Sequence, residues 1–519
     1  MTTQRTFVRK ISYFLAIGVL LLPLFLLGMP STNRGQGGKL AQVRTKNRLH
    51  QADLGQIDPT SATMKLMTFG FNGLAVNRLW ETHIDAKERE DWTTCGAALE
   101  QIKNLQPHSV EVWRFQAHNV SFNISCEFDD FRDRYRYIMK GIDMLTEGIR
   151  YNERSPHLLR EEARFIGFKI GKSDEAELFR PMFIHDDEYH QKDNMKGTRY
   201  AGRPETMRDN WQVSKWWYER ADKLFDEGLA SYGGLNSAVV HSDAAHSQMQ
   251  YAKSLELDGH FGDKALREWS ISAEDWRKLG AKLLQTGAGL HIRLASFHQQ
   301  REEEEQLRKD FDKLVAEQPG LQENILAKRR AALSEVERTA LDTKDDQRSG
   351  HQKALAAQAA ESMRISRRDL ALEMKPEHQT AALKLADRLT VAEDRLRMTD
   401  KYRDVVNYEY WRVRCEVERR ADTLEAREQI YAGDQALAKS KLPEALEHYN
   451  RALAKWKVVI DTYPRLLAEK TMVMELMQIV DKYQKILKQN GAEMPKPFVL
   501  QPVLDAYEVY TRQEKAQGE

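Results

Sequence analysis

Residues 105–125, LQPHSVEVWRFQAHNVSFNIS, constrain the fold of this chain more than any other stretch. Four apolar residues in it stand at i, i+4, i+7 and i+11, the spacing of one stripe along an α-helix: Trp113, Ala117, Val120 and Ile124. Phe115 and Phe122 fall on the opposite side of the same helix. Because a helix that is apolar on both sides is packed between neighbours, this stretch predicts one layer of a helical stack.

The composition agrees with a helix-rich protein of more than one unit. The chain has 519 residues, several times a typical domain of roughly 150, and 30% of them are charged. A net charge of +1 gives no global field that attracts nucleic acid, so we predict no nucleic-acid partner. Cys95, Cys126 and Cys415 are too few for a disulfide framework or a zinc site, and we expect them to be buried or incidental.

An uncharged apolar run of residues 11–30 begins at Ile11, ends at Pro30 and follows several basic residues. Its length is about the 20 residues that cross the hydrocarbon core of a bilayer, and Pro23 is compatible with such a helix. A cleaved signal peptide is the alternative, but its apolar core would be shorter and would end in a small-x-small site, which this run lacks. We therefore predict an uncleaved transmembrane anchor.

The charges around this run separate its two orientations only weakly. Five basic residues follow it: Arg34, Lys39, Arg44, Lys46 and Arg48. A short basic tail before a first span usually stays in the cytoplasm, which favours a body on the outer side of the membrane. In the opposite orientation, the five basic residues would lie on anionic headgroups.

Residues 31–59 are basic, contain several glycines and lack apolar periodicity, so we predict a linker that ends near Thr60. Far beyond it, residues 432–453, AGDQALAKSKLPEALEHYNRAL, carry the pattern of a helix pair. Small and large residues recur there with the spacing of two packed helices around a turn: Gly433, Ala436, Leu442, Ala445, Tyr449 and Ala452. This stretch resembles a tetratricopeptide repeat, and the resemblance implies an α-solenoid that binds segments of other proteins.

Looser forms of the same pattern recur in three other places. The first holds a second-helix spacing at Trp92, Cys95, Leu99, Ile102 and Pro107. The second pairs the opening stretch with Gly141, Leu145 and Gly148, across an insertion of residues 126–136. The third holds Phe261, Ala265, Trp269 and Ser272. We expect about four repeat-like helix pairs rather than a continuous array.

Residues 296–427 are dense in charge, with apolar residues at helical spacing such as Leu307, Phe311 and Leu314. They predict long helices in a hairpin or coiled coil, broken near Ser349 and Gly350 and again at Pro376. A solvated helix face explains any single charge run, but the sustained length favours a spacer or an oligomerisation stalk. The predicted organisation is therefore an anchor at 1–30, a linker at 31–59, a tetratricopeptide-like domain at 60–295, charged helices at 296–427 and a C-terminal helix pair at 428–519.

Three stretches look like chemical motifs, but none of them matches the pattern that such a site requires. Residues 167–175, GFKIGKSDE, are one residue short of a phosphate-binding P-loop and follow a predicted helix instead of a strand. Residues 185–190, HDDEYH, match no zinc or calcium spacing and predict a polar surface loop. His241, Asp243 and His246 have no nucleophile motif beside them. We predict no catalytic residues, no metal and no cofactor.

Four residues of the opening stretch are the predicted partner-binding site: Arg114, His118, Ser121 and Phe122. They cluster within one arc of the helix, and in the tetratricopeptide resemblance they fall where a first helix lines the concave surface. We expect Asn119 and Asn123 to make polar contacts between packed helices instead.

Residues 104–125, 135–152 and 165–183 together resemble an uncharacterised family of membrane-anchored bacterial proteins, some of which carry an iron-responsive-element label. The label is no evidence of chemistry. The resemblance implies a single-pass location in the bacterial inner membrane and no assigned activity. We therefore predict a membrane-anchored scaffold that binds other proteins, with a body on the periplasmic side; an enzyme of unrecognised type in a helical domain is the alternative.

Overall fold

The computed structural model describes most of the chain beyond residue 72. The described residues are 38–46, 72–89, 91–191, 207–230, 232 and 234–518, with a few isolated positions between 13 and 27. The predicted anchor at 11–30 and linker at 31–59 therefore lie largely outside the described residues. Among the helices that are described, none is both long and apolar enough to cross a membrane.

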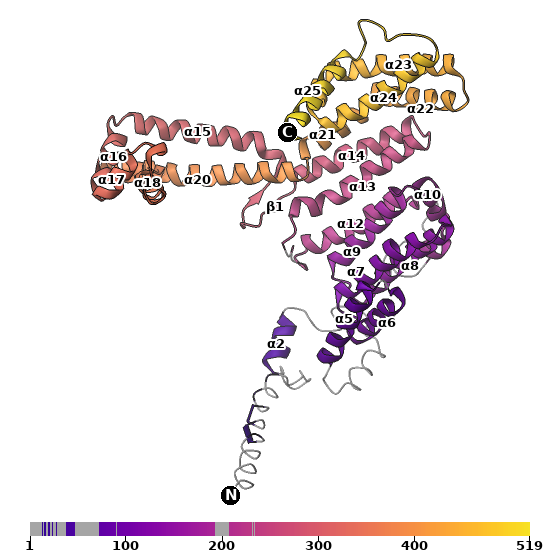
Figure 1. The fold of residues 1–519 in the computed structure, drawn as a ribbon, viewed down its shortest axis with the longest axis horizontal. Coiled ribbons are helices and arrows are strands. Elements are labelled where there is room, and N and C mark those ends of the chain that lie inside the picture. Colours follow the sequence, from indigo (N-terminus) through magenta and orange to yellow (C-terminus); the bar gives the residue numbers. More distant parts are fainter. Residues whose placement is uncertain are drawn as a thin grey trace. The chain divides into compact units, whose positions relative to one another are not determined.

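The predicted all-α fold class is confirmed within these residues (Figure 1). The only described sheet is a small antiparallel hairpin of β1 (Leu284–Gln285) and β2 (His291–Ile292). Contacts divide the chain into two compact units, residues 1–233 and 234–519. The domain boundaries predicted at 295 and 427 fall inside the second unit, and they stay predictions.

The first unit is a series of helices that pack in pairs, α5 with α6, α7 with α8 and α9 with α12. Its described elements are α2 (Lys39–Lys46), α5 (Asn72–Glu88), α6 (Trp92–Leu105), α7 (Val110–His118), η1 (Asn119–Asn123), η2 (Ile124–Glu127), α8 (Phe131–Tyr151), α9 (Pro156–Arg164), η3 (Phe165–Ile170), α10 (Ala176–Ile184), α11 (Asp187–Gln191) and α12 (Asn210–Asp226). Local caps define several of these helices. Asp91 accepts a hydrogen bond from the Thr94 backbone amide at 3.1 Å, and Ser155 precedes Pro156 in the first turn of α9.

Trp113 anchors the packing of α7 on α8, as its place on the apolar stripe predicts. Its indole is fully buried, and its Nε1 donates to the Pro107 carbonyl at 2.8 Å. A Cβ on Gly148 would lie 2.6 Å from the indole, so α8 needs a glycine at this crossing. The helix α7 is packed between neighbours as predicted, since it contacts α6, α8 and α9, but Phe115 on the opposite side is left 47% exposed.

One end of each of the two rejected motifs of this unit packs into its core. Residues 165–170 form the π-helix η3, and a Cβ on Gly171 would lie 2.6 Å from the Trp211 ring, so the glycines serve close packing. The surface loop predicted at 185–190 is correct only in part, because His185, Asp187 and Glu188 are exposed but the segment enters α11. Tyr189 and His190 are buried, since Tyr189 donates a hydrogen bond to the buried Glu162 at 3.2 Å.

The second unit joins paired helices to a long helical hairpin. Its elements besides the β-hairpin are α13 (Ser237–Leu257), α14 (Asp263–Ala281), η5 (Leu294–Ser296), α15 (Phe297–Ala316), α16 (Leu321–Ala332), α17 (Glu335–Asp342), η6 (Asp345–Gln347), α18 (Gly350–Met363), α19 (Arg367–Glu373), α20 (Pro376–Val405), α21 (Tyr408–Glu418), α22 (Ala421–Ala438), α23 (Leu442–Thr462), η7 (Pro464–Ala468), α24 (Lys470–Gln489) and α25 (Gln501–Gly518).

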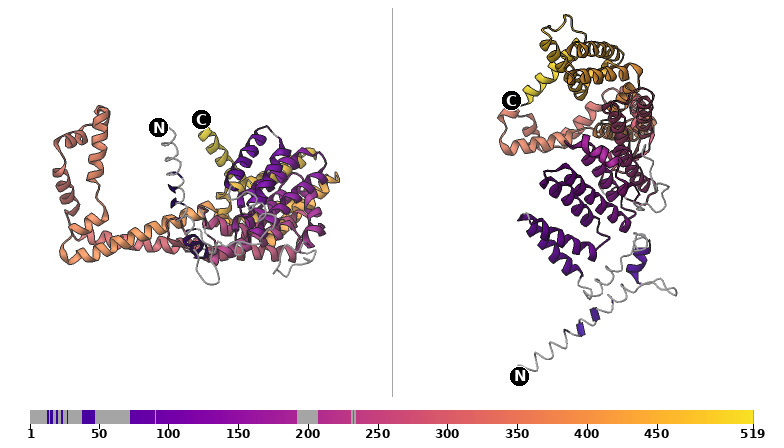
Figure 2. Two further views of the ribbon diagram at one scale, coloured as in Figure 1. Left: turned by 90° about the horizontal axis from the view of Figure 1, so that it is seen from below. Right: turned by 90° about the vertical axis from the view of Figure 1, so that its right-hand side faces the viewer.

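The charged segment forms a helical hairpin, one of the two arrangements that its periodicity predicts. The helices α15 and α20 lie side by side, with the shorter helices α16 to α19 at their far end (Figures 1 and 2). Leu307 and Phe311 are buried against α20. The predicted breaks are confirmed, because Ser349 caps α18 and Pro376 opens α20.

The helices α22 and α23 pack around the residues that the repeat pattern singles out. A Cβ on Gly433 would lie 2.7 Å from the buried Tyr449 ring, so the small residue leaves room for the large one.

Arg427 of α22 joins four helices of the unit. It contacts carboxylates of α21, α24 and α13: Glu418 at 2.5 Å, Glu475 at 3.0 Å and Glu256 at 3.6 Å.

Candidate functional site

The structure brings three of the four predicted site residues together and separates the fourth. The His118 ring stacks on Phe122 with centroids 4.6 Å apart and planes 6° from parallel. Arg114 lies one turn earlier on α7 and pairs with Glu111 at 3.0 Å. Ser121 is fully buried instead, and its hydroxyl donates to the Ile138 carbonyl of α8 at 3.0 Å. We leave Ser121 out of the candidate site.

The backbone conformation of this stretch explains why Ser121 lies apart from the other three predicted site residues. Residues 119–123 form the π-helix η1, in which the Ile124 amide bonds to the Asn119 carbonyl five residues earlier. A π-turn holds an extra residue, so the side chains after His118 are rotated from their positions on an ideal α-helix. Spacing rules based on 3.6 residues per turn therefore place Ser121 on the wrong face.

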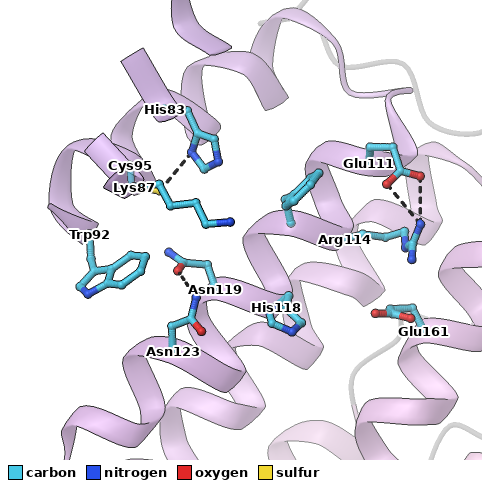
Figure 3. Close-up of a pocket in the computed structure, with 11 residues that line it drawn as sticks. His83, Lys87, Trp92, Cys95, Glu111, Arg114, His118, Asn119, Asn123 and Glu161 are labelled. Atoms are coloured by element: carbon cyan, nitrogen blue, oxygen red, sulfur yellow. Dashed lines mark hydrogen bonds and ion pairs between the residues drawn. The ribbon is translucent and has the colours of Figure 1, made fainter. Parts of the chain in front are cut away.

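Arg114 and His118 line a cavity of about 480 Å³ on the first unit, which we call the α7 pocket (Figure 3). Its lining comes from α5, the start of α6, α7, η1 and α9: His83, Lys87, Trp92, Cys95, Glu111, Arg114, Phe115, His118, Asn119, Asn123 and Glu161. This volume falls in the range of ligand pockets, about 300–1,000 Å³. Four separate segments of the chain thus meet at the predicted arc.

Polar side chains that the sequence did not single out meet in this pocket. The buried Cys95 thiol lies 3.0 Å from His83 Nδ1, and Asn123 Nδ2 donates to Asn119 Oδ1 at 3.0 Å (Figure 3). Burial raises the pKa of the Cys95 thiol and lowers the pKa of His83. The pair is therefore a neutral thiol beside a neutral imidazole, and a neutral thiol is a weak nucleophile.

Aromatic rings provide the apolar part of the pocket. Phe115 presents almost half of its surface to solvent and meets the Trp80 ring edge to face, with centroids 5.9 Å apart. Trp92, which the repeat pattern places at the beginning of a second helix, lies at the start of α6 and lines the pocket. Exposed aromatic rings beside a cavity are typical of surfaces that bind a partner.

Positive charge dominates around His118. Both carboxylates of the pocket are engaged by arginines, Glu111 by Arg114 at 3.0 Å and Glu161 by Arg164 at 2.6 Å. Desolvation lowers the pKa of His118 first, and the positive charges of Arg164, Lys87 and Lys169 lower it further, with Glu161 opposing them. The site therefore disfavours an added cation.

Two lysines near this site have no carboxylate partner within the described part of the chain. Lys87 projects from the exposed side of α5 into the space among the pocket residues (Figure 3). Lys169 of η3 holds its Nζ 4.6 Å from the centroid of the Phe122 ring. Neither lysine could be found from the sequence, because η3 and α5 are far from α7 along the chain.

Across the described ranges, no group of three or more His, Cys, Asp or Glu side chains has an arrangement that would hold a metal ion. No protein-family model, curated protein or solved structure matches this chain. The site must therefore be interpreted from its own geometry.

Proposed function

We propose that this protein is a membrane-anchored helical-repeat scaffold that binds a segment of another protein in the α7 pocket. The observation that carries the proposal is Phe115, a large apolar side chain left 47% exposed at the mouth of a cavity. A monomeric protein gains stability by covering such a ring, so its exposure beside a pocket favours a partner that covers it.

The repeat assignment rests on the helix pairs. In a tetratricopeptide-like stack, the first helices line the concave surface, and α5, α7 and α9 would be the first helices of the pairs α5–α6, α7–α8 and α9–α12. All three of these helices contribute to the α7 pocket. The close contact of Gly433 with Tyr449 supports the same assignment for α22 and α23.

The membrane assignment rests on the apolar run at 11–30, whose length suits a bilayer span. The rival function, an enzyme of unrecognised type, would have the Cys95–His83 pair as its best candidate centre. The raised pKa of the buried thiol opposes that assignment, because a nucleophilic cysteine needs its thiolate form near neutral pH. We therefore favour binding over catalysis.

A photo-crosslinking residue in place of Phe115 tests the proposal in the native membrane. We expect the full-length protein to form a covalent adduct with one or a few proteins on irradiation. The matched control carries the same residue in place of Leu178, which is 46% exposed on α10 and lies outside the pocket. Equal or absent adducts at the two positions would mean that the α7 pocket does not bind a partner.

A further inference from the structure

The α7 pocket has an excess of positive charge around His118. The lining alone is balanced, with Lys87 and Arg114 against Glu111 and Glu161. Arg164 and Lys169 flank it and act on His118 together with Lys87, and Glu161 is the one carboxylate that opposes them. The two arginines already pair with Glu111 and Glu161, so the two lysines carry the excess.

The two lysines come from different elements and lie near different aromatic rings. Lys87 comes from α5, beside His83, whose ring centroid lies 6.4 Å from that of Phe115. Lys169 comes from η3 and lies over Phe122, the ring that stacks on His118. Both lysines act on His118, which lines the same pocket as the exposed Phe115.

We propose that the α7 pocket recognises an acidic peptide segment, in which carboxylates flank an aromatic or large aliphatic side chain. The apolar side chain packs on Phe115 inside the cavity, and the flanking carboxylates pair with Lys87 and Lys169. This inference rests on the proposed function and specifies the chemistry of its ligand.

Two alternatives fit the pocket less well. A basic segment would bring more positive charge to a site that already holds an excess of it, which costs Coulomb energy in a partly desolvated cavity. A small inorganic anion would meet the lysines but would leave Phe115 and Trp92 uncovered. A peptide with both acidic and apolar side chains satisfies both parts of the surface.

The test measures the fluorescence anisotropy of labelled peptides with the full chain in detergent micelles. The probe is a fluorescein-labelled peptide with the core Asp-Glu-Phe-Glu-Leu. Its analogues replace the acids by lysine, or the Phe and Leu by serine. A labelled single-stranded oligonucleotide serves as an anionic probe without such side chains. We expect the acidic apolar peptide to bind about tenfold tighter than each analogue and than the oligonucleotide, and added salt to weaken it.

Charge reversal of the two lysines is the critical variant. We expect Lys87→Glu with Lys169→Glu to weaken binding of the acidic peptide about tenfold while the melting temperature stays unchanged. The matched control is Lys140→Glu. Lys140 is also an exposed lysine over an aromatic ring, 5.6 Å from the centroid of Tyr137, but it lies on α8 outside the pocket. Its reversal should leave the affinity unchanged.

Several results would overturn the inference. They are equal or tighter binding of the lysine analogue or the oligonucleotide, an affinity that survives the double reversal, or no binding of the acidic peptide. The crosslinking experiment at Phe115 separates this failure from that of the proposed function. If Phe115 captures a partner through a basic or uncharged segment, only the peptide class is wrong. If it captures nothing, the proposed function fails as well.

Discussion

Among single residues, the buried carboxyl group of Glu162 has the clearest consequence for the pH dependence of stability. Its carboxyl group is fully buried and accepts hydrogen bonds from Thr146 Oγ1 at 2.9 Å and from the Tyr189 hydroxyl at 3.2 Å. Burial raises the pKa of Glu162 to about 8, although the two hydrogen bonds oppose the shift. At neutral pH the folded protein therefore holds this carboxyl group in its protonated form.

The sign of the pH dependence follows from this shift. Because the folded pKa lies above the unfolded value of 4.5, the proton on Glu162 stabilises the fold fully below pH 4.5. This contribution is lost as the pH rises through about 8. Glu162→Gln removes the titration and keeps an acceptor oxygen, so its free energy of unfolding should not fall over that range.

Urea denaturation of the wild type and Glu162→Gln at about pH 5 and about pH 9 measures the difference. We expect similar stabilities at the acidic pH, and a more stable variant at the alkaline pH. Thr146→Val serves as a comparison, because it removes one hydrogen bond to Glu162 and leaves the titrating group in place. Parallel pH profiles for the wild type and Glu162→Gln would show that Glu162 ionises normally.

At the scale of an element, α7 presents two faces with different tasks. Trp113 is buried against α8, whereas Phe115, two residues later, points into the α7 pocket. Residues two apart on a helix lie about 200° apart, so one side chain faces the core and the other faces the proposed binding site. The two aromatic residues therefore separate stability from binding.

Alanine substitutions at these two positions of α7 should have different effects, one on stability and the other on peptide binding. Trp113→Ala removes a buried indole and its hydrogen bond to Pro107, and we expect it to cost about 3–5 kcal/mol of the free energy of unfolding. Phe115→Ala should cost less than about 1 kcal/mol and still abolish peptide binding. Urea denaturation and peptide anisotropy on both variants measure the two effects. A large loss of stability in Phe115→Ala would place that ring in the core.

At the scale of the whole molecule, the apolar run at 11–30 predicts that the protein is held in a membrane. We expect the full-length chain to remain in the membrane fraction after washes with high salt and alkaline carbonate, because a helix of this length inserts into the hydrocarbon core. A chain that begins at Thr60 should partition into the aqueous fraction. Release of the full-length chain by carbonate would mean a cleaved signal peptide or peripheral attachment.

The local signals of the sequence predicted many elements of the fold. Trp113, Ala117 and Val120 of the predicted stripe are buried, and Ile124, its last member, is partly buried. The chain breaks near Ser349 and Pro376 as predicted, and each begins a helix. These predictions succeeded because periodicity and capping depend on residues within one or two turns of each other. The contact between α22 and α23 also follows from spacing, since a three-residue turn brings the two helices together.

The candidate site could be predicted only in part. Arg114 and His118 were found because both project from one helix, but Ser121 was misplaced because nothing in the local spacing indicates that η1 takes a π-turn. His83, Lys87 and Cys95 come from α5 and α6, so their meeting with α7 depends on how the helices pack. The sequence alone therefore predicted only lining residues that α7 contributes to the pocket.

By itself, the sequence determined the helices, their ends, the apolar faces that must be covered and the run that suits a bilayer. Tertiary structure alone decided which apolar side chain stays uncovered, as Phe115 does, and which carboxyl group is desolvated, as Glu162 is. The physical reason is the range of the forces. Backbone geometry and capping act between neighbours in the chain, whereas burial and the electrostatic field are sums over groups that only folding brings together.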